Sequence, residues 1–269
     1  MKTIYFSVLL LICGSTIAQD KQQQLLADNN IRSMRIEGVE YNKGKISKQT
    51  FNLEEFDQYG NTTVFKAMDE DNNIKTEIVY NYSPDGNTRY EKQFDKAGEL
   101  KYTFVTITNR EDRSLRRLQI GTAKDTFVDQ TRYRGVNLKD SIMYSVKFGA
   151  RVLDWKWEYD DEGRLIGETR YDGFGDPMYE ATYTYEIEGD CVKRFDQDGD
   201  LDLHECISGN TEVLHMLRTF DGFLYGLRLP FEEGGKMVTT KTQEGLDARR
   251  QYFSKKGDLM AEITYTYQK

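Results

Sequence analysis

The sequence predicts an all-β protein, built as an antiparallel up-and-down meander of repeated hairpins. First, the phrase "GDPMYEATYTY" at 175–185 returns as "GDLMAEITYTY" at 257–267, with eight of eleven letters identical. Second, a turn motif of an aromatic residue, Asp and a later Gly recurs along the chain. Third, the segments between turns alternate apolar and polar side chains, which is the period-two pattern of half-buried strands.

Residues 1–18 are expected to be an export signal peptide. An apolar run covers residues 4–13, and Thr16 and Ala18 occupy the small-residue positions of a cleavage site. The run is too short to cross a bilayer, which needs about 20 apolar residues. Lipidation of Cys13 is the alternative, but Ile12 stands where a lipoprotein site normally has a small residue. The sequence therefore predicts an exported protein, periplasmic or extracellular, with no transmembrane segment in the mature chain.

The mature chain should hold a linker or short helix at 19–30 and a β-meander repeat domain at 31–269. The leader contains one Lys and no carboxylate, so the remainder carries 36 basic and 45 acidic side chains, a net charge of −9. An acidic protein repels nucleic acid and anionic lipid surfaces, so nucleic acid is excluded as a partner. Tyr and Phe make up a large share of the apolar residues, which suits strands better than helices.

The turn motif explains where each predicted strand ends. It reads "FDQYG" at 56, "YSPDG" at 82, "FDKAG" at 94, "YDDEG" at 159, "YDGFG" at 171, "YEIEG" at 185, "FDQDG" at 195 and "FSKKG" at 253. A degenerate copy, "MDEDN" at 68, has Asn73 one residue beyond the glycine position. Asp can accept hydrogen bonds from the amides ahead of it, and Gly tolerates the positive φ that closes a hairpin.

The strands between these turns are expected to have one wet and one dry face. In "LDWKWEY", Trp155, Trp157 and Tyr159 share one face, and the charged residues share the other. Helical candidates are few, at 19–30 and 212–220, so about sixteen strands of ordinary length must bury their apolar side by themselves. We therefore expect an open roll or spiral, or stacked sheets, with longer loops near 109–150 and 207–247.

At "YDDEGRL" (159–165) the chain resembles the Tyr-Asp repeat of the Rhs and YD-repeat families, as found in small exported proteins of Bacteroidetes type. The likeness covers most of 45–107 and 150–205 and the last 20 residues. It implies an exported β-rich scaffold, with an adhesive or sugar-contacting surface in some members. A toxin-delivery role is not implied, because the repeats are few and no toxin segment follows them.

Catalytic motifs are scarce. His204 and His215 are the two histidines, and the chain lacks a Gly-x-Ser-x-Gly elbow and a His-Glu-x-x-His helix. A carboxylate pair of the kind that glycosidases use remains open, although most aspartates are accounted for by turns. Trp155 and Trp157 could stack on a sugar, but their place on the apolar face favours core packing.

One segment, "DQDGDLDLHE" (196–205), carries the candidate metal site. Its alternating acids are Asp196, Asp198, Asp200 and Asp202. Ca²⁺ prefers several oxygen ligands at short range, so a calcium site is one reading. The spacing departs from the EF-hand loop, because Gly199 is fourth and Ile207 is twelfth. An ordinary Phe-Asp-x-x-Gly turn is the other reading, and it requires no cofactor.

Two cysteines, Cys191 and Cys206, flank this turn symmetrically. A four-residue loop would place them directly opposite each other, and export would permit a disulfide. A three-residue loop with a Gly bulge would instead shift the register by one residue and misalign them. The sequence leaves both possibilities open.

The function expected from these features is that of a non-enzymatic binding or scaffold module in the cell envelope, whose partner is a protein or a glycan. A lipid or lipoprotein carrier, with a cavity enclosed by the curled sheet, is the alternative. An outer-membrane barrel is disfavoured, because Lys92 shares a face with Tyr90 and Phe94. A carbohydrate hydrolase is the remaining class.

Overall fold

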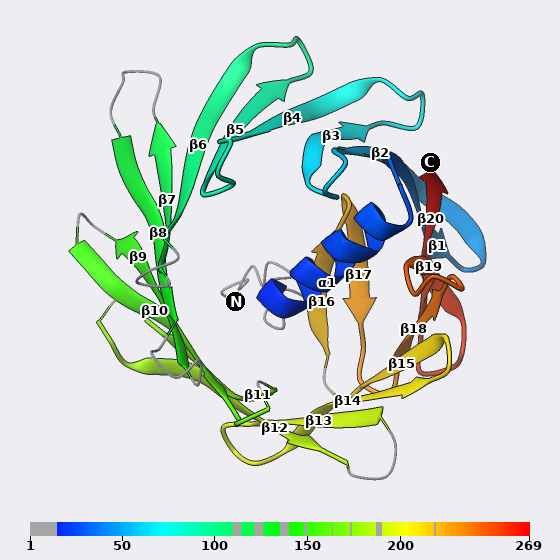
Figure 1. Ribbon diagram of the computed structural model, residues 1–269. Coiled ribbons are helices and arrows are strands. Elements are labelled where there is room, and N and C mark those ends of the chain that lie inside the picture. Colours follow the sequence, from blue (N-terminus) through cyan, green and yellow to red (C-terminus); the bar gives the residue numbers. More distant parts are fainter. Residues whose placement is uncertain are drawn as a thin grey trace. The chain divides into compact units, whose positions relative to one another are not determined.

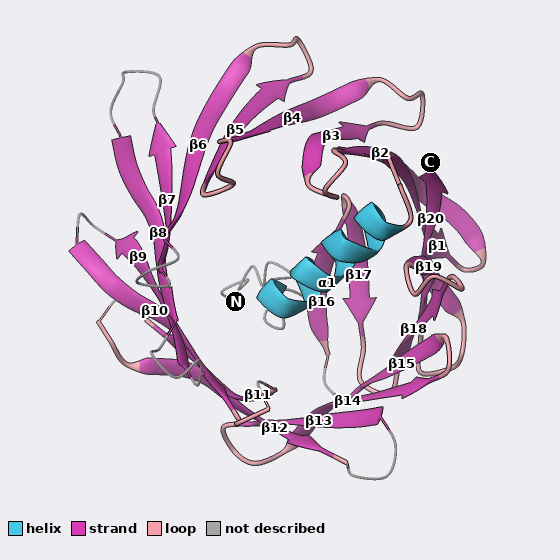
Figure 2. Ribbon diagram, viewed as in Figure 1, coloured by secondary structure: helices cyan, strands magenta, loops and turns pink. Residues whose placement is uncertain are grey.

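The computed structural model describes residues 15–109, 114–120, 126–134, 140–147, 150–162, 164–172, 174–186, 190–217 and 219–269. Within these residues one helix, α1 (Ser15–Asp28), accompanies strands β1 to β20 (Figure 1). Strands account for most of the described chain, as Figure 2 shows. The predicted leader lies outside the described residues up to position 14. α1 begins at Ser15 and continues through the predicted cleavage point after Ala18.

The chain forms two compact units. Unit 1 comprises Met1–Thr76, Tyr185–Lys193 and Leu201–Lys269, and unit 2 comprises Glu77–Thr184 and Arg194–Asp200. Most of unit 2 is therefore inserted, in sequence, between two parts of unit 1. The strands of both units fall within the segment 31–269.

Unit 1 contains an antiparallel sheet in which the first strand of the chain pairs with the last. In pairing order, the strands are β14 (Leu201–Ser208), β15 (Thr211–Met216), β18 (Lys236–Lys241), β19 (Asp247–Phe253), β20 (Leu259–Gln268), β1 (Ser33–Asn42), β2 (Lys45–Phe56) and β3 (Thr62–Met68). Ile36 of β1 lies opposite Tyr265 of β20 and Asn52 of β2. A strictly consecutive meander would leave β1 unpaired on one side, and this arrangement removes that edge.

The apolar face of unit 1 is covered by α1 and by a hairpin of β16 (Phe220–Leu224) and β17 (Leu227–Phe231). The buried core cluster consists of Leu26, Ile31, Met34, Ile36, Phe56, Met216, Leu227, Leu229, Phe231, Met237, Leu246, Tyr252, Ala261, Ile263 and Tyr265. Gly38 of β1 permits this packing, because a Cβ there would come within 2.6 Å of the Leu227 side chain. The expectation that the sheet buries its apolar side without help therefore does not describe unit 1.

The segment 212–220, a helical candidate in the sequence, forms β15 and the start of β16 instead. Around residue 215 its side chains alternate between buried and exposed, as in a strand. Leu214 packs against the core and Met216 is buried in it, whereas His215 between them is exposed.

Unit 2 is the consecutive meander that the repeats predict. The neighbours along its ladder are β5 (Thr88–Asp95), β6 (Leu100–Asn109), β7 (Ser114–Ile120), β8 (Thr126–Arg134), β9 (Asp140–Lys147), β10 (Ala150–Tyr159), β11 (Leu165–Tyr171) and β12 (Pro177–Tyr185). β4 (Ile74–Tyr82) and β13 (Asp190–Asp196) each contain residues of both units. The predicted all-β, antiparallel, up-and-down fold class is thus confirmed.

The repeated turns have a common structure. At the turn after β2, the Asp57 carboxylate accepts hydrogen bonds from the amides of Tyr59 (2.8 Å) and Asn61 (2.9 Å), and Gly60 has a φ of 76°. Asp69, Asp95, Asp172 and Asp196 likewise accept from the amides two and four residues ahead. Asn72, with a φ of 61°, takes the glycine's place in the degenerate copy. Asp therefore organises the loop, as predicted.

The aromatic residue of the motif marks a change of register. In five hairpins the ladder shifts immediately before Phe56, Phe94, Tyr159, Tyr171 and Phe253. The repeat therefore encodes a bulge together with a turn, and bulges increase the local twist of a strand.

Candidate functional site

The most distinctive surface of unit 2 combines aromatic and charged side chains on one face of its sheet. Thr106 of β6 lies between Arg89 of β5 and Arg117 of β7 in the strand register. Farther along the sheet, Arg170 of β11 lies between Trp155 of β10 and Tyr179 of β12. Directly opposed residues share a face. The register through β8 and β9 extends that face from one group to the other. The charged aromatic face consists of Arg89, Glu91, Phe104, Thr106, Arg117, Trp155, Trp157, Glu168, Arg170, Tyr179, Ala181 and Tyr183.

The opposite face is polar in β10 and β12. Lys156 lies between the two tryptophans, and Glu180, Thr182 and Thr184 of β12 are exposed. The predicted alternation is therefore present in these strands. The charged aromatic face on the other side is not an ordinary apolar core, however, because it also contains charged residues.

Glu168 is at the centre of this face. Its side chain is buried, with 4% of the residue exposed, and its Oε1 accepts hydrogen bonds from the hydroxyls of Tyr183 (2.9 Å) and Tyr179 (3.1 Å). Burial raises the pKa of Tyr183, and the negative charge of Glu168 raises it further. Tyr183 therefore remains protonated and acts as a donor to the carboxylate.

The tryptophans lie beside this carboxylate. The rings of Trp155 and Trp157 stack with centroids 5.7 Å apart and an interplanar angle of 2°, and Tyr179 meets Trp155 edge-on at 6.3 Å. The Arg170 guanidinium lies over the Trp155 ring, 5.6 Å from its centroid. Trp157 is buried, as core packing predicts, but Trp155 is only half-buried.

A second buried carboxylate, Glu91, lies on the same face. Its oxygens lie 3.4 Å from Arg117 Nη2 and 3.8 Å from Arg89 Nη2. The Arg117 guanidinium covers the Phe104 ring at 4.0 Å, and that of Arg89 lies 5.5 Å from the Tyr80 ring. Removing charges from water opposes folding unless they are well paired. Two buried carboxylates on one face, Glu91 and Glu168, therefore oppose folding, and packing alone does not explain their presence.

Unit 1 has its own half-buried polar network, at the start of β19. The Asp247 carboxylate accepts hydrogen bonds from Lys241 (3.1 Å) and Arg250 (2.5 and 3.1 Å). The hydroxyl of Tyr267 donates to the Asp247 backbone carbonyl at 2.8 Å. Burial works against ionisation of Asp247, but the positive charges of Arg250 and Lys241 outweigh it and lower the pKa of this carboxyl.

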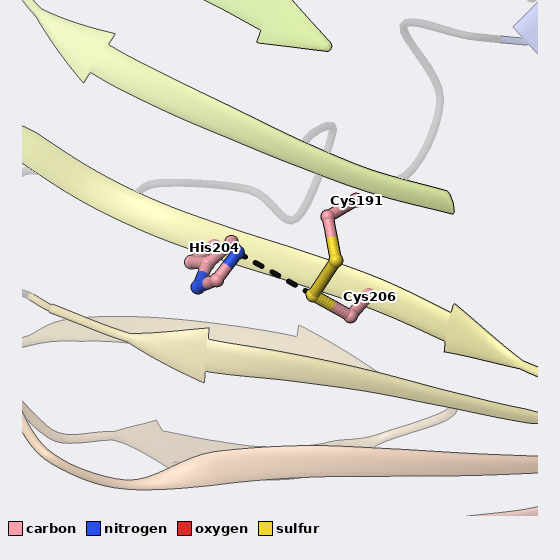
Figure 3. A group of neighbouring side chains, drawn as sticks. All are labelled: Cys191, His204 and Cys206. Atoms are coloured by element: carbon pink, nitrogen blue, oxygen red, sulfur yellow. Dashed lines mark hydrogen bonds between the residues drawn. A yellow bond between two sulfur atoms is a disulfide. The ribbon is translucent and has the colours of Figure 1, made fainter. Parts of the chain in front are cut away.

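The predicted cysteine pair lies in unit 1 together with both histidines of the chain. Cys191 and Cys206 form a disulfide, with Cα atoms 4.1 Å apart. The Cys206 sulfur lies 3.4 Å from Nε2 of His204 (Figure 3). His215 lies opposite His204 in the β14–β15 register, with ring centroids 6.2 Å apart. We refer to these four residues as the Cys–His cluster.

The common turn explains why the cysteines face each other. In the hairpins at Asp57, Asp95 and Asp160, the residue two before the Asp pairs with the residue seven after it. If the hairpin at Asp196 has the same register, the residue five before the Asp, Cys191, pairs with the residue ten after it, Cys206. The bulge was expected to misalign the pair; in these hairpins it restores the alignment, because it compensates for the odd-numbered turn.

The four predicted calcium ligands have separate environments. In unit 2, Asp196 is buried and accepts from the amides of Asp198 (3.0 Å) and Asp200 (2.8 Å), and the latter two residues are exposed. Asp202 is buried in unit 1. The calcium site stays a prediction. Among the described residues, the metal-capable group that the geometry identifies is Cys191, His204 and Cys206 instead.

Sequence reasoning missed the charges of the aromatic face. Glu168 and Arg170 follow Leu165 and Ile166, which occupy both faces of the strand, so no alternation indicates their direction. The pairing of His204 with Cys206 had a visible signal, because two ligand-type residues at i and i+2 point to the same side of a strand.

Neither the known protein families nor the curated proteins contain a match to this chain. Among solved structures it is similar to a porin-like protein from Bacteroides uniformis, with a TM-score of 0.36, 9% identity, and coverage of 88% of this chain and 96% of that one. A DUF1329 family protein from Desulfovibrio piger has a TM-score of 0.22 and 8% identity, with coverage of 93% of this chain and 91% of that one. A chain of the MucA/MucB complex of Pseudomonas aeruginosa has a TM-score of 0.16 and 8% identity, with coverage of 93% of both chains. TM-scores this low carry no argument about function.

In the described part of the chain, no helix has the length and apolarity that a bilayer crossing requires.

Proposed function

We propose that this protein is an exported, non-enzymatic binding module of the cell envelope, similar to YD-repeat proteins, and that the charged aromatic face of unit 2 binds a glycan. The observation that carries the proposal is the buried Glu168 carboxylate, held by two tyrosine hydroxyls beside the half-buried Trp155 ring. The leader-like N-terminus and the Cys191–Cys206 disulfide support export, because disulfides persist in oxidising compartments.

A glycan suits this face because a sugar ring has two kinds of surface. Its C–H face can stack on an aromatic ring, and its hydroxyls can pair with carboxylate and guanidinium groups. Binding sites commonly combine aromatic walls with a few fixed polar groups. Arg170 Nε is buried and has no hydrogen-bond partner within the described part of the chain, so it has a donor to offer a ligand.

An acyl chain suits the face less well. An acyl chain would offer no polar partner to Arg170, whose Nε has none within the described part of the chain, and covering a charged group with hydrocarbon is unfavourable. In unit 1, the apolar face is already filled by its own residues, since Leu227 and Leu229 of the covering hairpin are fully buried.

The test is glycan-array binding of the oxidised full chain, followed by titration of the best glycan using tryptophan fluorescence. Both tryptophans lie on the proposed face, so their emission should change on binding. Trp155→Ala should raise Kd by roughly 30-fold or more, the effect of losing about 2 kcal/mol from an aromatic hot spot. Lys156→Ala is the matched control, because this neighbour points to the other face, where it pairs with Glu158 at 2.6 Å.

Four outcomes would contradict the proposal. An array without binding, or equal affinity for wild type and Trp155→Ala, would show that the charged aromatic face does not bind a glycan. Stoichiometric lipid in a solvent extract of the purified protein would favour the carrier alternative. Glycan fragments of lower mass after incubation would indicate a hydrolase.

A further inference from the structure

The Cys–His cluster brings together residue types that this chain uses sparingly. The sequence contains two histidines and three cysteines. His204 lies beside the disulfide of the two cysteines that follow the predicted leader, and His215 lies opposite His204. A structural disulfide needs no histidine neighbours. The four side chains instead form the set that binds zinc in Cys₂His₂ sites.

The strand register places these side chains on one face. His204 and Cys206 are two residues apart on β14, so they point to the same side, and His215 lies directly opposite His204 on β15. Cys191 reaches them from β13 through the disulfide. One ligand atom from each of Cys191, His204 and Cys206 lies within 4.8 Å of the others.

The distances match a tetrahedral centre. Zn–S bonds of about 2.3 Å and Zn–N bonds of about 2.05 Å place sulfur and nitrogen ligands roughly 3.6 Å apart. The Cys206 Sγ to His204 Nε2 distance is already 3.4 Å. The two sulfurs must separate to about 3.8 Å, which breaking the disulfide allows. The ring of His215, which lies outside this group of three, must turn toward them.

We propose that the Cys–His cluster is a redox-gated Zn²⁺ site, closed while the disulfide is present and formed when a dithiol reductant opens it. The disulfide accepts two electrons and two protons from the reductant, which becomes a disulfide itself. Zn²⁺ then displaces the two thiol protons and binds two thiolates, and the neutral imidazoles of His204 and His215 supply the other two ligands. His215 is exposed, so a metal ion can reach the cluster from solvent.

Zn²⁺ is the ion that these ligands favour. Thiolate and imidazole suit zinc, whereas calcium and magnesium require oxygen ligands. The inference is independent of glycan binding, because it concerns unit 1 and different residues.

The experiment uses the full chain, reduced with a phosphine and mixed with Zn²⁺ in competition with a chromophoric chelator. Reduced wild type should bind one Zn²⁺ per chain, and the oxidised protein should bind none. Co²⁺ substitution should give the intense visible bands of tetrahedral coordination and a thiolate charge-transfer band in the near ultraviolet. His204→Ala should weaken binding by more than the roughly 100-fold that loss of an outer-shell partner costs.

His204→Ala and His215→Ala keep both cysteines, so their folding can be verified in the oxidised form by circular dichroism. Glu205→Gln is the control, because Glu205 lies between His204 and Cys206 on β14 and points to the other side. The proposal is overturned if reduced wild type binds Zn²⁺ no better than His204→Ala, or if Co²⁺ gives the weak spectrum of octahedral coordination. It is also overturned if reduction unfolds the protein and Zn²⁺ does not restore the fold.

Discussion

Replacing Glu54 by Gln should stabilise unit 1 in alkaline but not in acidic solution. Glu54 lies on β2 opposite Met34 of β1, a residue with 2% exposure, and burial raises the pKa of its carboxyl to about 7. Its ordinary value is 4.5. The charge of Glu54 also contributes to the raised pKa of Tyr225 and Tyr267, after burial itself.

The sign follows from proton binding. Below pH 4.5 the carboxyl is protonated in both states. Between pH 4.5 and about 7 the unfolded chain loses this proton and the folded chain keeps it, so stability falls as pH rises. Above pH 7 the penalty is complete. At about 1.4 kcal/mol for each tenfold change in the dissociation constant, it amounts to about 3 kcal/mol.

Gln keeps the shape of a protonated Glu and cannot ionise. The difference in unfolding free energy between Glu54→Gln and wild type should therefore grow by about 3 kcal/mol from pH 4.5 to pH 8. Hydrogen–deuterium exchange of the β1 and β2 amides measures it, since both tryptophans lie in unit 2 and do not report on unit 1. Glu55→Gln is the control, because Glu55 pairs with Lys66 on the other face at 3.8 Å. A difference that is equal at both pH values, or equal for the two variants, would refute the reasoning.

Two further substitutions examine the packing of unit 1. Leu227→Ala removes a side chain with 0% exposure and should cost 2–5 kcal/mol in urea denaturation, roughly as other buried leucines do; Leu100→Ala, at 47% exposure, should change little, and equal effects would contradict the assignment of the core. Gly60→Ala should destabilise more than Gly98→Ala. Both have a φ of 76°, but a Cβ at Gly60 would collide with the Gln23 carbonyl of α1, whereas Gly98 faces open space. Equal melting temperatures for the two alanine variants would show that α1 does not pack against this turn.

The turns were the most predictable part of this protein. Asp57 and Gly60 act within five residues, so the sequence contains the whole interaction. In the degenerate copy the residue with the positive φ is Asn72, not the adjacent Asn73, because Asn also tolerates the left-handed conformation. The register shift that accompanies each turn was less predictable, because a bulge was expected to misalign Cys191 and Cys206, whereas the structure joins them in a disulfide.

Long-range partners could not be predicted in the same way. The pairing of Ile36 with Tyr265 joins residues at opposite ends of the chain, and period two specifies a face without specifying a neighbour. Glu168 reads as a solvent-facing residue until the register places it opposite Trp157. The Cys–His cluster could not be predicted as one site, because only the strand register brings His215 opposite His204.

The position of β1 between β2 and β20 has a consequence for biosynthesis. A ribosome delivers β1 long before β20, so the eight-stranded sheet of unit 1 stays incomplete until β20 has emerged. The inserted meander has only neighbour-to-neighbour pairings, and such local topologies form quickly. Nascent chains should therefore acquire the inserted unit first, while β1 waits with an unsatisfied edge for its partner from the C-terminus.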